Sequence, residues 1–337
     1  MMKNLNEKLD LFSLITLSIV VNLVVYYGFT SAYNNLTQVS KIPEQYYSSV
    51  YRYRVLSREI LEMVFNGAQK IFKGEVSSQP YLLSKGSLFY HTLFVINTFF
   101  SVASLLLIEA IFSIKRFFGI EKENKLLLTL VLIILMAISQ YVVTFYDNSA
   151  LCFLLLSIYF VLKYKETHRF FYLLILSLVV IISTLNRETS ALSLSFLLAV
   201  SLKKNEVNLT EIKKILKIMA LPFLSFIVTY ILLRVSDNAG SGVMEGIYIK
   251  ENFTQLNNLS GLLFAILVLR MAYRISRTKE NKKLITRFLF FSSPYLLMLV
   301  LVGILWEIRL FIPLIFGSFI LSQIKWEQNK TMPHHFP

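Results

Sequence analysis

Long apolar runs separated by short polar segments make up most of the chain. A helix needs about 20 mostly apolar residues to cross a hydrocarbon core about 30 Å thick. The runs that meet or approach this length are 11–29, 87–112, 126–145, 149–162, 170–185, 191–202, 218–235, 259–273, 288–306 and 310–324. The pattern predicts an all-α fold, a polytopic membrane helix bundle of about 10 transmembrane helices.

The composition agrees with a membrane-embedded chain. Apolar residues make up 55% of it and charged residues only 16%, whereas soluble domains carry about 25% charged residues. Neither an internal repeat nor a polar linker of domain length is visible, so residues 1–337 are expected to form a single membrane domain. Its parts are a first span at 11–29, an outer loop at 30–86, the remaining spans at 87–324 and an inner tail at 325–337. A single Cys and four His favour neither a disulfide framework nor a metal centre built from these residues.

The basic residues indicate an orientation. If the N-terminus is inside, the inner segments hold 23 Lys and Arg, and the short outer loops between the later spans hold only Arg187, Arg234, Lys250 and Arg309. This asymmetry predicts a multi-pass protein of the cell membrane with both termini cytoplasmic. The formal charge of +14 then lies where it meets anionic membrane lipids, so no nucleic-acid partner is expected.

The long first outer loop has an amphipathic pattern. Between residues 50 and 71 apolar positions alternate with Arg and Glu at helical spacing, which predicts an interfacial amphipathic helix. Arg52, Arg54 and Arg58 lie at or near the start of this segment, and guanidinium groups bind phosphate oxygens bidentately. These residues are therefore candidates for binding a lipid phosphate. The alternative is a helix that only rests on acidic lipids.

Three short outer hairpins carry charge at a similar depth. Charged side chains near hydrocarbon cost several kcal/mol unless they pair or face water, so their recurrence on one side indicates a site. The residues concerned are Tyr146, Asp147, Arg187, Glu188, Glu307 and Arg309. The alternative is that Arg187 with Glu188, and Glu307 with Arg309, are ion pairs that only stabilise the bundle.

These landmarks resemble those of a known family. The acidic, tyrosine-rich segment 44–47, the Tyr-Arg-x-Arg-x-Leu-like segment 51–56, the Tyr146-Asp147 pair and the Arg-Glu-Thr step at 187–189 follow one another along the chain. A Glu-x-Arg pair at 307–309, followed by Pro313, marks the last spans. Together they are similar to integral-membrane glycosyltransferases of the GT-C type, which use a polyprenyl-phosphate-linked sugar as donor. The resemblance implies a GT-C-like bundle with its active site on the extracytoplasmic face.

The resemblance also implies a reaction and its participants. A sugar would pass from a polyprenyl-phosphate donor to a hydroxyl of a glycan or glycolipid acceptor, with inversion. This needs a carboxylate base and cations for the leaving phosphate. The family places an Asp base in the first outer loop, but this chain has no Asp between residues 11 and 146, so Glu44 is the first candidate and Asp147 the second. The expected substrate-binding residues are Tyr46, Tyr47, Arg52, Arg54, Arg58, Tyr146, Arg187, Glu188, Trp306, Glu307 and Arg309.

Other functions stay open at this stage. A divalent cation, Mg or Mn, is compatible with the family, although the sequence shows no ligand set for it. The rival functions are a polysaccharide polymerase or ligase, a transporter or flippase of a lipid-linked or anionic solute, and a non-catalytic subunit of envelope assembly. Transporters usually place charges near the bilayer midplane, whereas the charges here gather at one face.

Overall fold

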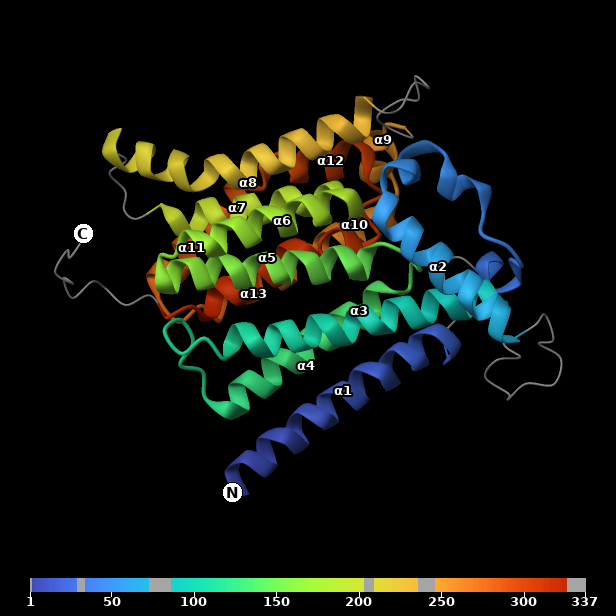
Figure 1. Ribbon diagram of the computed structural model, residues 1–337, viewed down its shortest axis with the longest axis horizontal. Coiled ribbons are helices and arrows are strands. Elements are labelled where there is room, and N and C mark those ends of the chain that lie inside the picture. The colour runs from blue at the N-terminus through green and yellow to red at the C-terminus, as the bar shows by residue number, and fades with distance from the viewer. Residues whose placement is uncertain (1, 29–33, 73–85, 203–208, 236–245, 326–337) are drawn as a thin grey trace.

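The computed structural model describes residues 2–28, 34–72, 86–202, 209–235 and 246–325, and these form helices and loops without a β-strand. The long helices run side by side along the longest axis of the molecule (Figure 1). Parts of the first outer loop and nearly all of the predicted inner tail at 325–337 lie outside the described residues.

The N-terminal two thirds form a row of packed helices. In order of contact they are α1 (Met2–Gly28), α3 (Leu88–Phe112), α5 (Asp147–Thr167), α6 (Phe170–Asn186) and α8 (Leu209–Val235). The central helix α5 is buried along most of its length, through residues such as Leu155, Ile158 and Val161. The outermost helix α8 instead leaves Leu216, Phe223 and Leu232 exposed. An apolar surface of this kind is suited to lipid contact.

Five described helices are long and apolar enough to cross a membrane: Leu9–Gly28, Leu88–Phe112, Asp147–Thr167, Leu209–Val235 and Leu256–Arg274. A sixth span results if the bent pair α11 (Lys279–Phe291) and α12 (Ser293–Val302) is counted as one. The helices α6, α7 (Ala191–Ser201) and α13 (Ile312–Gln323) are apolar but shorter. The chain is therefore a helical membrane protein, and about ten crossings stay a prediction.

In two places the helices differ from the apolar runs that predicted them. The run at 126–145 becomes α4 (Lys122–Ser139), and residues 140–146 form the connection to α5. The run at 288–306 is broken between α11 and α12, whose axes differ by 52°. Pro294 in the first turn of α12 explains this break, because proline has no N–H to donate to the carbonyl of Phe290 and its ring would clash with that carbonyl in a continuous helix. The span predicted at 288–306 therefore contains a bend, and whether the bent pair crosses the membrane stays a prediction.

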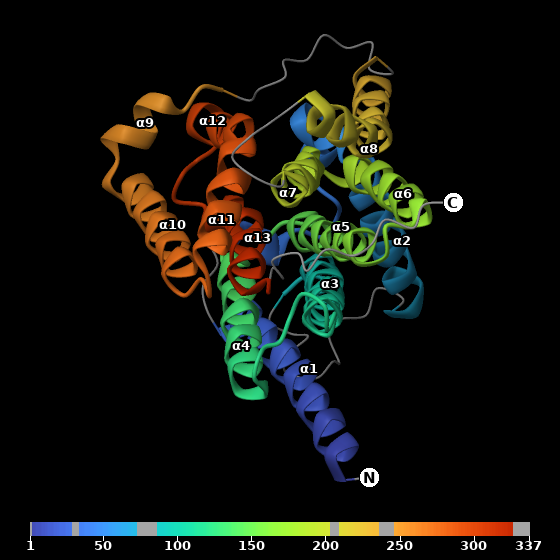
Figure 2. The ribbon, with the colours of Figure 1, turned by 90° about the vertical axis from the view of Figure 1, so that its left-hand side faces the viewer.

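The C-terminal third packs against the row from one side. Figure 2 shows α9 (Ile249–Thr254), α10 (Leu256–Arg274) and α12 grouped beside α11 and α13. The helices α11 and α13 pack closely at Gly317, where an added Cβ atom would lie 2.6 Å from the Phe288 ring. The same ring contacts Phe196 of α7, with centroids 5.9 Å apart, so α13 and α7 meet through Phe288.

Residues 34–72, which belong to the loop predicted to be outer and are named the first outer segment, cover one end of the bundle (Figure 1). This segment contains the short 3₁₀ helices η1 (Asn34–Gln38), η2 (Glu44–Tyr47) and η3 (Ser49–Tyr53), followed by α2 (Val55–Phe72). The amphipathic helix expected between residues 50 and 71 is thus present as α2, which packs on α3 and α6. Its residues Leu61 and Phe65 are buried, whereas Met63 and Ile71 are exposed.

Candidate functional site

Several of the predicted site residues converge on the turn that starts α5. Tyr146 precedes the helix and Asp147 is its first residue. Both are buried, with exposed fractions of 2% and 8%. The turns after α6 and before α13 reach the same point, because α5 packs against both helices. Residues from three distant hairpins therefore meet at one end of the bundle.

The carboxylate of Asp147 joins two of these hairpins. Its Oδ1 accepts from the guanidinium of Arg187, and its Oδ2 accepts from that of Arg309. Thr144 adds a hydrogen bond to Oδ2 at 2.6 Å. A second acid, Glu307, accepts from Nη2 of Arg309 at 2.7 Å. The Glu307–Arg309 pair agrees with the stabilising alternative considered for that hairpin, whereas Arg187 pairs across hairpins with Asp147 rather than with Glu188.

The electrostatics of this cluster favour charged arginines. Burial alone would lower the pKa of Arg309. The Asp147 carboxylate and the neighbouring Tyr146 and Glu307 raise this pKa by more than burial lowers it, so it lies well above the ordinary value for arginine. The pKa of Arg187 is likewise raised: burial opposes the charge, and Asp147 outweighs it. Asp147 is held by two cations and a hydroxyl, so it is suited to orienting guanidinium groups rather than to accepting a proton.

Arg54 completes the cluster from the first outer segment. It follows η3, is only 8% exposed and lies with its Cζ atom 3.6 Å from the centroid of the Tyr146 ring. The Tyr51 ring lies on it as well, at 5.0 Å. Its Nε and Nη1 atoms are buried and find no hydrogen-bond acceptor in the described part of the chain. Arg54 is therefore a cation that aromatic faces position, with no carboxylate partner among the residues that the structure describes.

Polar residues that sequence reasoning missed hold these elements together. The side-chain oxygen of Asn186 accepts from Ser149 of α5 at 2.9 Å and from Ser57 of α2. Its amide nitrogen donates to the Tyr146 carbonyl at 3.4 Å. Thr144 was missed too. The sequence offered one signal for each residue: Asn186 lies directly before Arg187, and Thr144 lies three residues before Asp147.

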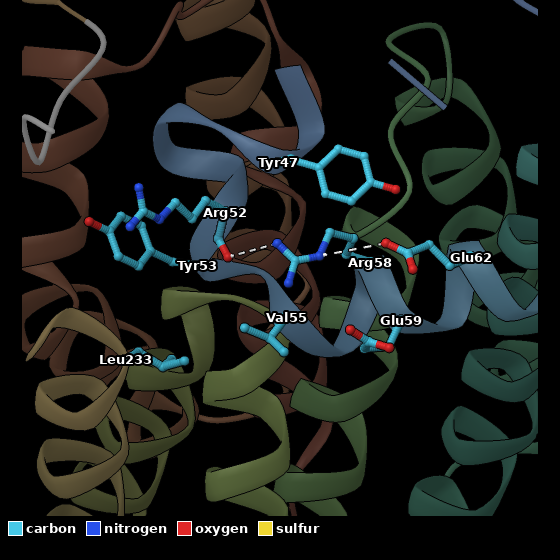
Figure 3. A pocket seen from close by; sticks show the side chains of 8 residues that line it. All are labelled: Tyr47, Arg52, Tyr53, Val55, Arg58, Glu59, Glu62 and Leu233. Atoms are coloured by element: carbon cyan, nitrogen blue, oxygen red, sulfur yellow. Dashed lines mark hydrogen bonds and ion pairs between the residues drawn. The ribbon is translucent and has the colours of Figure 1, made fainter. Parts of the chain in front are cut away.

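A charged pocket of about 360 Å³ lies beside the cluster (Figure 3). It brings together three of the predicted residues, Tyr47, Arg52 and Arg58. Arg58 donates to the Arg52 carbonyl at 3.4 Å and lies 3.9 Å from Glu62. The remaining lining residues are Tyr53, Val55, Glu59 and Leu233. Because the lining contains two arginines and two glutamates, this pocket lacks the excess positive charge of the Arg54 cluster.

Two predicted acids lie outside the cluster. Glu44 begins η2 and is exposed, and no hydrogen bond or ion pair joins it to another described residue. Its neighbour Tyr46 is buried and packs on Phe145, with ring centroids 4.5 Å apart, so η2 lies against the chain just before Tyr146. Glu188 instead pairs at 3.5 Å with Arg234 of α8, whose Cζ lies 3.8 Å over the Tyr53 ring.

Trp306, which was also predicted to bind substrate, lines a second pocket of about 600 Å³. This pocket lies between the turn at Tyr141, the start of α10 and the chain before η6 (Ile308–Leu310). The Trp306 and Tyr141 rings meet edge to face at 6.2 Å. The structure therefore separates the predicted site into a buried cluster, a charged pocket and an aromatic pocket.

A divalent cation does not fit the carboxylates of the cluster. Asp147 and Glu307 both bind arginine, and within the described ranges no three His, Cys, Asp or Glu side chains are grouped as metal ligands. Acidic oxygen ligands would be needed for Mg²⁺ or Mn²⁺. We therefore derive no catalytic step through a metal ion.

The fold and the cluster define a class: a helical membrane protein with a buried arginine–carboxylate cluster at one end of its bundle. Comparison with known proteins finds no matching family model, no similar curated protein and no similar solved structure.

Proposed function

We propose that the chain is a GT-C-type membrane glycosyltransferase, which moves a sugar from a polyprenyl-phosphate donor to a hydroxyl of a glycan or glycolipid. The observation that carries the proposal is the Arg54 guanidinium, buried on the face of Tyr146 with Nε and Nη1 unpaired among the described residues. A buried donor without an acceptor costs about 1–3 kcal/mol, and more when it is charged. A phosphate oxygen supplies the missing acceptor.

The charge balance of the cluster supports an anionic ligand. The cluster contains three guanidinium groups, those of Arg54, Arg187 and Arg309, but only two carboxylates, those of Asp147 and Glu307. The excess of one positive charge lies where burial lowers the dielectric response, so it interacts strongly with an anion. Charge-assisted hydrogen bonds to phosphate are strong, and the unpaired Nε and Nη1 of Arg54 offer two separate N–H donors for its oxygens.

The residues then divide the reaction between them. The acceptor oxygen forms a bond to the anomeric carbon as the bond from that carbon to the phosphate oxygen breaks, and the phosphate leaves with the electron pair. Arg54 stabilises the charge that grows on the phosphate, together with Arg187 and Arg309, which lie near the same Tyr146 ring. Asp147 keeps those two arginines in place and is a positioning residue. Glu44 takes the acceptor proton, because it is an exposed carboxylate on the segment that packs on Phe145.

The membrane location suits this chemistry. The isoprenoid tail of the donor stays in lipid along the apolar faces of the bundle, while its phosphate reaches the end where the cluster lies. We place that end on the extracytoplasmic side, since the Lys- and Arg-rich connections lie at the other end. In this arrangement α6, α7 and α13 supply further crossings together with the loops that extend them, which brings the total toward the predicted ten.

The test is transfer of radiolabelled sugar from a panel of polyprenyl-phosphate sugars to membrane lipid and glycan acceptors, with purified protein in liposomes. Arg54→Ala is expected to reduce transfer by about a hundredfold, because one phosphate contact of about 2.7 kcal/mol is lost. Arg54→Lys restores the charge without the bidentate geometry and is expected to recover only part of the rate. Arg270→Ala, which removes an exposed arginine of α10, is the matched control.

The base is tested in the same assay. Glu44→Gln is expected to abolish transfer while leaving donor binding intact, because an amide cannot accept the proton. Absence of transfer with every donor, from folded and correctly oriented protein, would overturn the proposal. Transfer that is unchanged in Arg54→Ala would overturn the assigned site.

A further inference from the structure

The pocket at Trp306 differs in chemistry from the rest of the site. Its volume is about 600 Å³, within the range of small-ligand sites. Among the described residues, no Asp, Glu, Lys, Arg or His lines it. Its walls are aromatic and amide side chains with one hydroxyl and two small or apolar residues, namely Tyr141, Gln255, Asn257, Asn258, Ser260, Gly261, Phe264, Trp306 and Ile308. A ligand here is recognised by ring faces and hydrogen bonds rather than by charge.

The pocket shares a wall with the arginine cluster. Along residues 306–309 alternate side chains face opposite sides: Trp306 and Ile308 line the pocket, whereas Glu307 and Arg309 belong to the ion pairs at Asp147. Gly261 allows α10 to lie directly against the backbone of this wall, since a Cβ atom added at Gly261 would lie 2.5 Å from the Trp306 Cα. A molecule in the pocket is therefore separated from the cluster by one thickness of backbone.

One wall residue has an unused acceptor. Asn258 is 2% exposed and donates through Nδ2 to the Glu251 carbonyl at 3.0 Å. Its Oδ1 is buried and has no hydrogen-bond partner among residues the structure describes. Buried polar atoms are nearly always paired, so an unpaired acceptor in a pocket wall points to a ligand that donates a hydrogen bond. Around it, Gln255, Asn257 and Ser260 are exposed and offer both donors and acceptors.

From these observations we infer that the pocket binds an uncharged saccharide. A pyranose has an apolar face that packs on an indole ring and a rim of hydroxyl groups that both donate and accept, which matches Trp306 and the surrounding amides. The absence of ionisable lining residues disfavours a uronic acid or a phosphate. The inference that a saccharide binds here does not depend on the proposed sugar transfer. Its assignment to the glycan acceptor, rather than to the donor sugar, rests on the proposed function.

Trp306 can report its own ligand. The chain has two tryptophans, Trp306 and Trp326, so Trp326→Phe leaves Trp306 as the single indole. The full-length protein in detergent would be titrated with neutral methyl glycosides of common hexoses and N-acetylhexosamines, and with their trisaccharides. Sorbitol, which has hydroxyl groups but no ring, and methyl glucuronoside, which is charged, are the ligand controls. At least one neutral glycoside is expected to change the Trp306 emission saturably, and neither control is.

Variants of the pocket wall test the assignment. Asn257→Ala and Ser260→Ala change exposed side chains and preserve folding, and each is expected to weaken the apparent affinity by about three- to tenfold. Asn258→Ala is expected to weaken it by at least about tenfold. Asn124→Ala, which removes an exposed asparagine at the other end of the bundle, is the matched control and leaves it unchanged.

The outcomes separate this inference from the proposed reaction. A response to no glycoside, an equal response to sorbitol, or an affinity unchanged by all three wall variants overturns it. Saturable saccharide binding in a protein that transfers no sugar would support the pocket and contradict the reaction. Transfer by the parent protein without saccharide binding at Trp306 would support the reaction and contradict the saccharide pocket.

Discussion

The guanidinium of Arg54 lies 3.6 Å from the centroid of the Tyr146 ring, so an arginine of the first outer segment rests on the residue before α5. An aromatic face attracts a cation without neutralising it. A carboxylate at the same position would cancel the charge and occupy the N–H groups. The stacking therefore explains how Arg54 stays buried while Nε and Nη1 have no hydrogen-bond partner among the described residues, which is the basis of the proposed anion contact.

Replacing Tyr146 should separate the two roles of its ring and its hydroxyl. Tyr146→Leu removes the face under Arg54 and is expected to destabilise the protein by about 2 kcal/mol or more, because the cation–π contact is desolvated. Tyr146→Phe keeps the face and loses only the hydroxyl, which accepts from Arg309 at 3.3 Å, so a loss of about 1 kcal/mol is expected. Thermal unfolding in detergent measures both. Equal losses would show that Arg54 does not depend on the ring.

Asp147 should be far more sensitive than Glu188, although both are acids that pair with arginine. Asp147→Asn leaves Arg187 and Arg309 buried with a neutral partner, and breaking a buried ion pair costs about 3–5 kcal/mol. Glu188→Gln affects a partly exposed pair with Arg234, where about 1 kcal/mol or less is expected. The unfolding midpoints of the two variants, compared in one detergent, give the answer. Similar midpoints would contradict the described burial of the cluster.

The pairing of these charges marks a limit of sequence reasoning. Neighbours in sequence suggested that Arg187 pairs with Glu188, but the structure pairs Arg187 with Asp147 and Glu188 with Arg234. Adjacent residues at a helix end point in different directions, so the partner is decided by which helices pack together. The hairpins that carry the site could be found from charge near apolar runs, but the contacts between them could not.

The helices themselves were easier to predict than their ends. Length and hydropathy located α1, α3, α5 and the amphipathic α2, because each has a continuous apolar stretch or face. The same signal ran past the true end of α4 at Ser139, since the connection that follows contains the buried apolar residues Val142, Val143 and Phe145. Burial in the bundle and burial in lipid select the same residue types, so composition alone cannot separate a span from a buried turn.

Two glycines should respond to alanine in opposite directions. At Gly261 an added Cβ atom would lie 2.5 Å from the Trp306 Cα and closer still to the Leu305 carbonyl oxygen, so Gly261→Ala forces α10 away and is expected to cost about 1–3 kcal/mol. At Gly67, inside α2, nothing lies within 4 Å, and Gly67→Ala should stabilise the helix by about 1 kcal/mol. Thermal unfolding again measures both, and a stabilising Gly261→Ala would contradict the close approach of α10 to this wall.

The orientation of the bundle can be tested with single cysteines. The only native cysteine, Cys152, is buried, so Cys152→Ala provides a background without a thiol. Lys41→Cys places a thiol just before η2, in the segment that covers the cluster end in Figure 1. Glu123→Cys and Glu280→Cys place one in the first turns of α4 and α11, which begin at the other end, and all three positions are exposed. A membrane-impermeant maleimide applied to intact cells is expected to label Lys41→Cys and to label the other two only after permeabilisation. Labelling of Glu123→Cys or Glu280→Cys in intact cells, with Lys41→Cys protected, would invert the topology and place the arginine cluster on the cytoplasmic side. The donor phosphate and the acceptor would then have to be cytoplasmic as well, which the charge asymmetry of the loops disfavours.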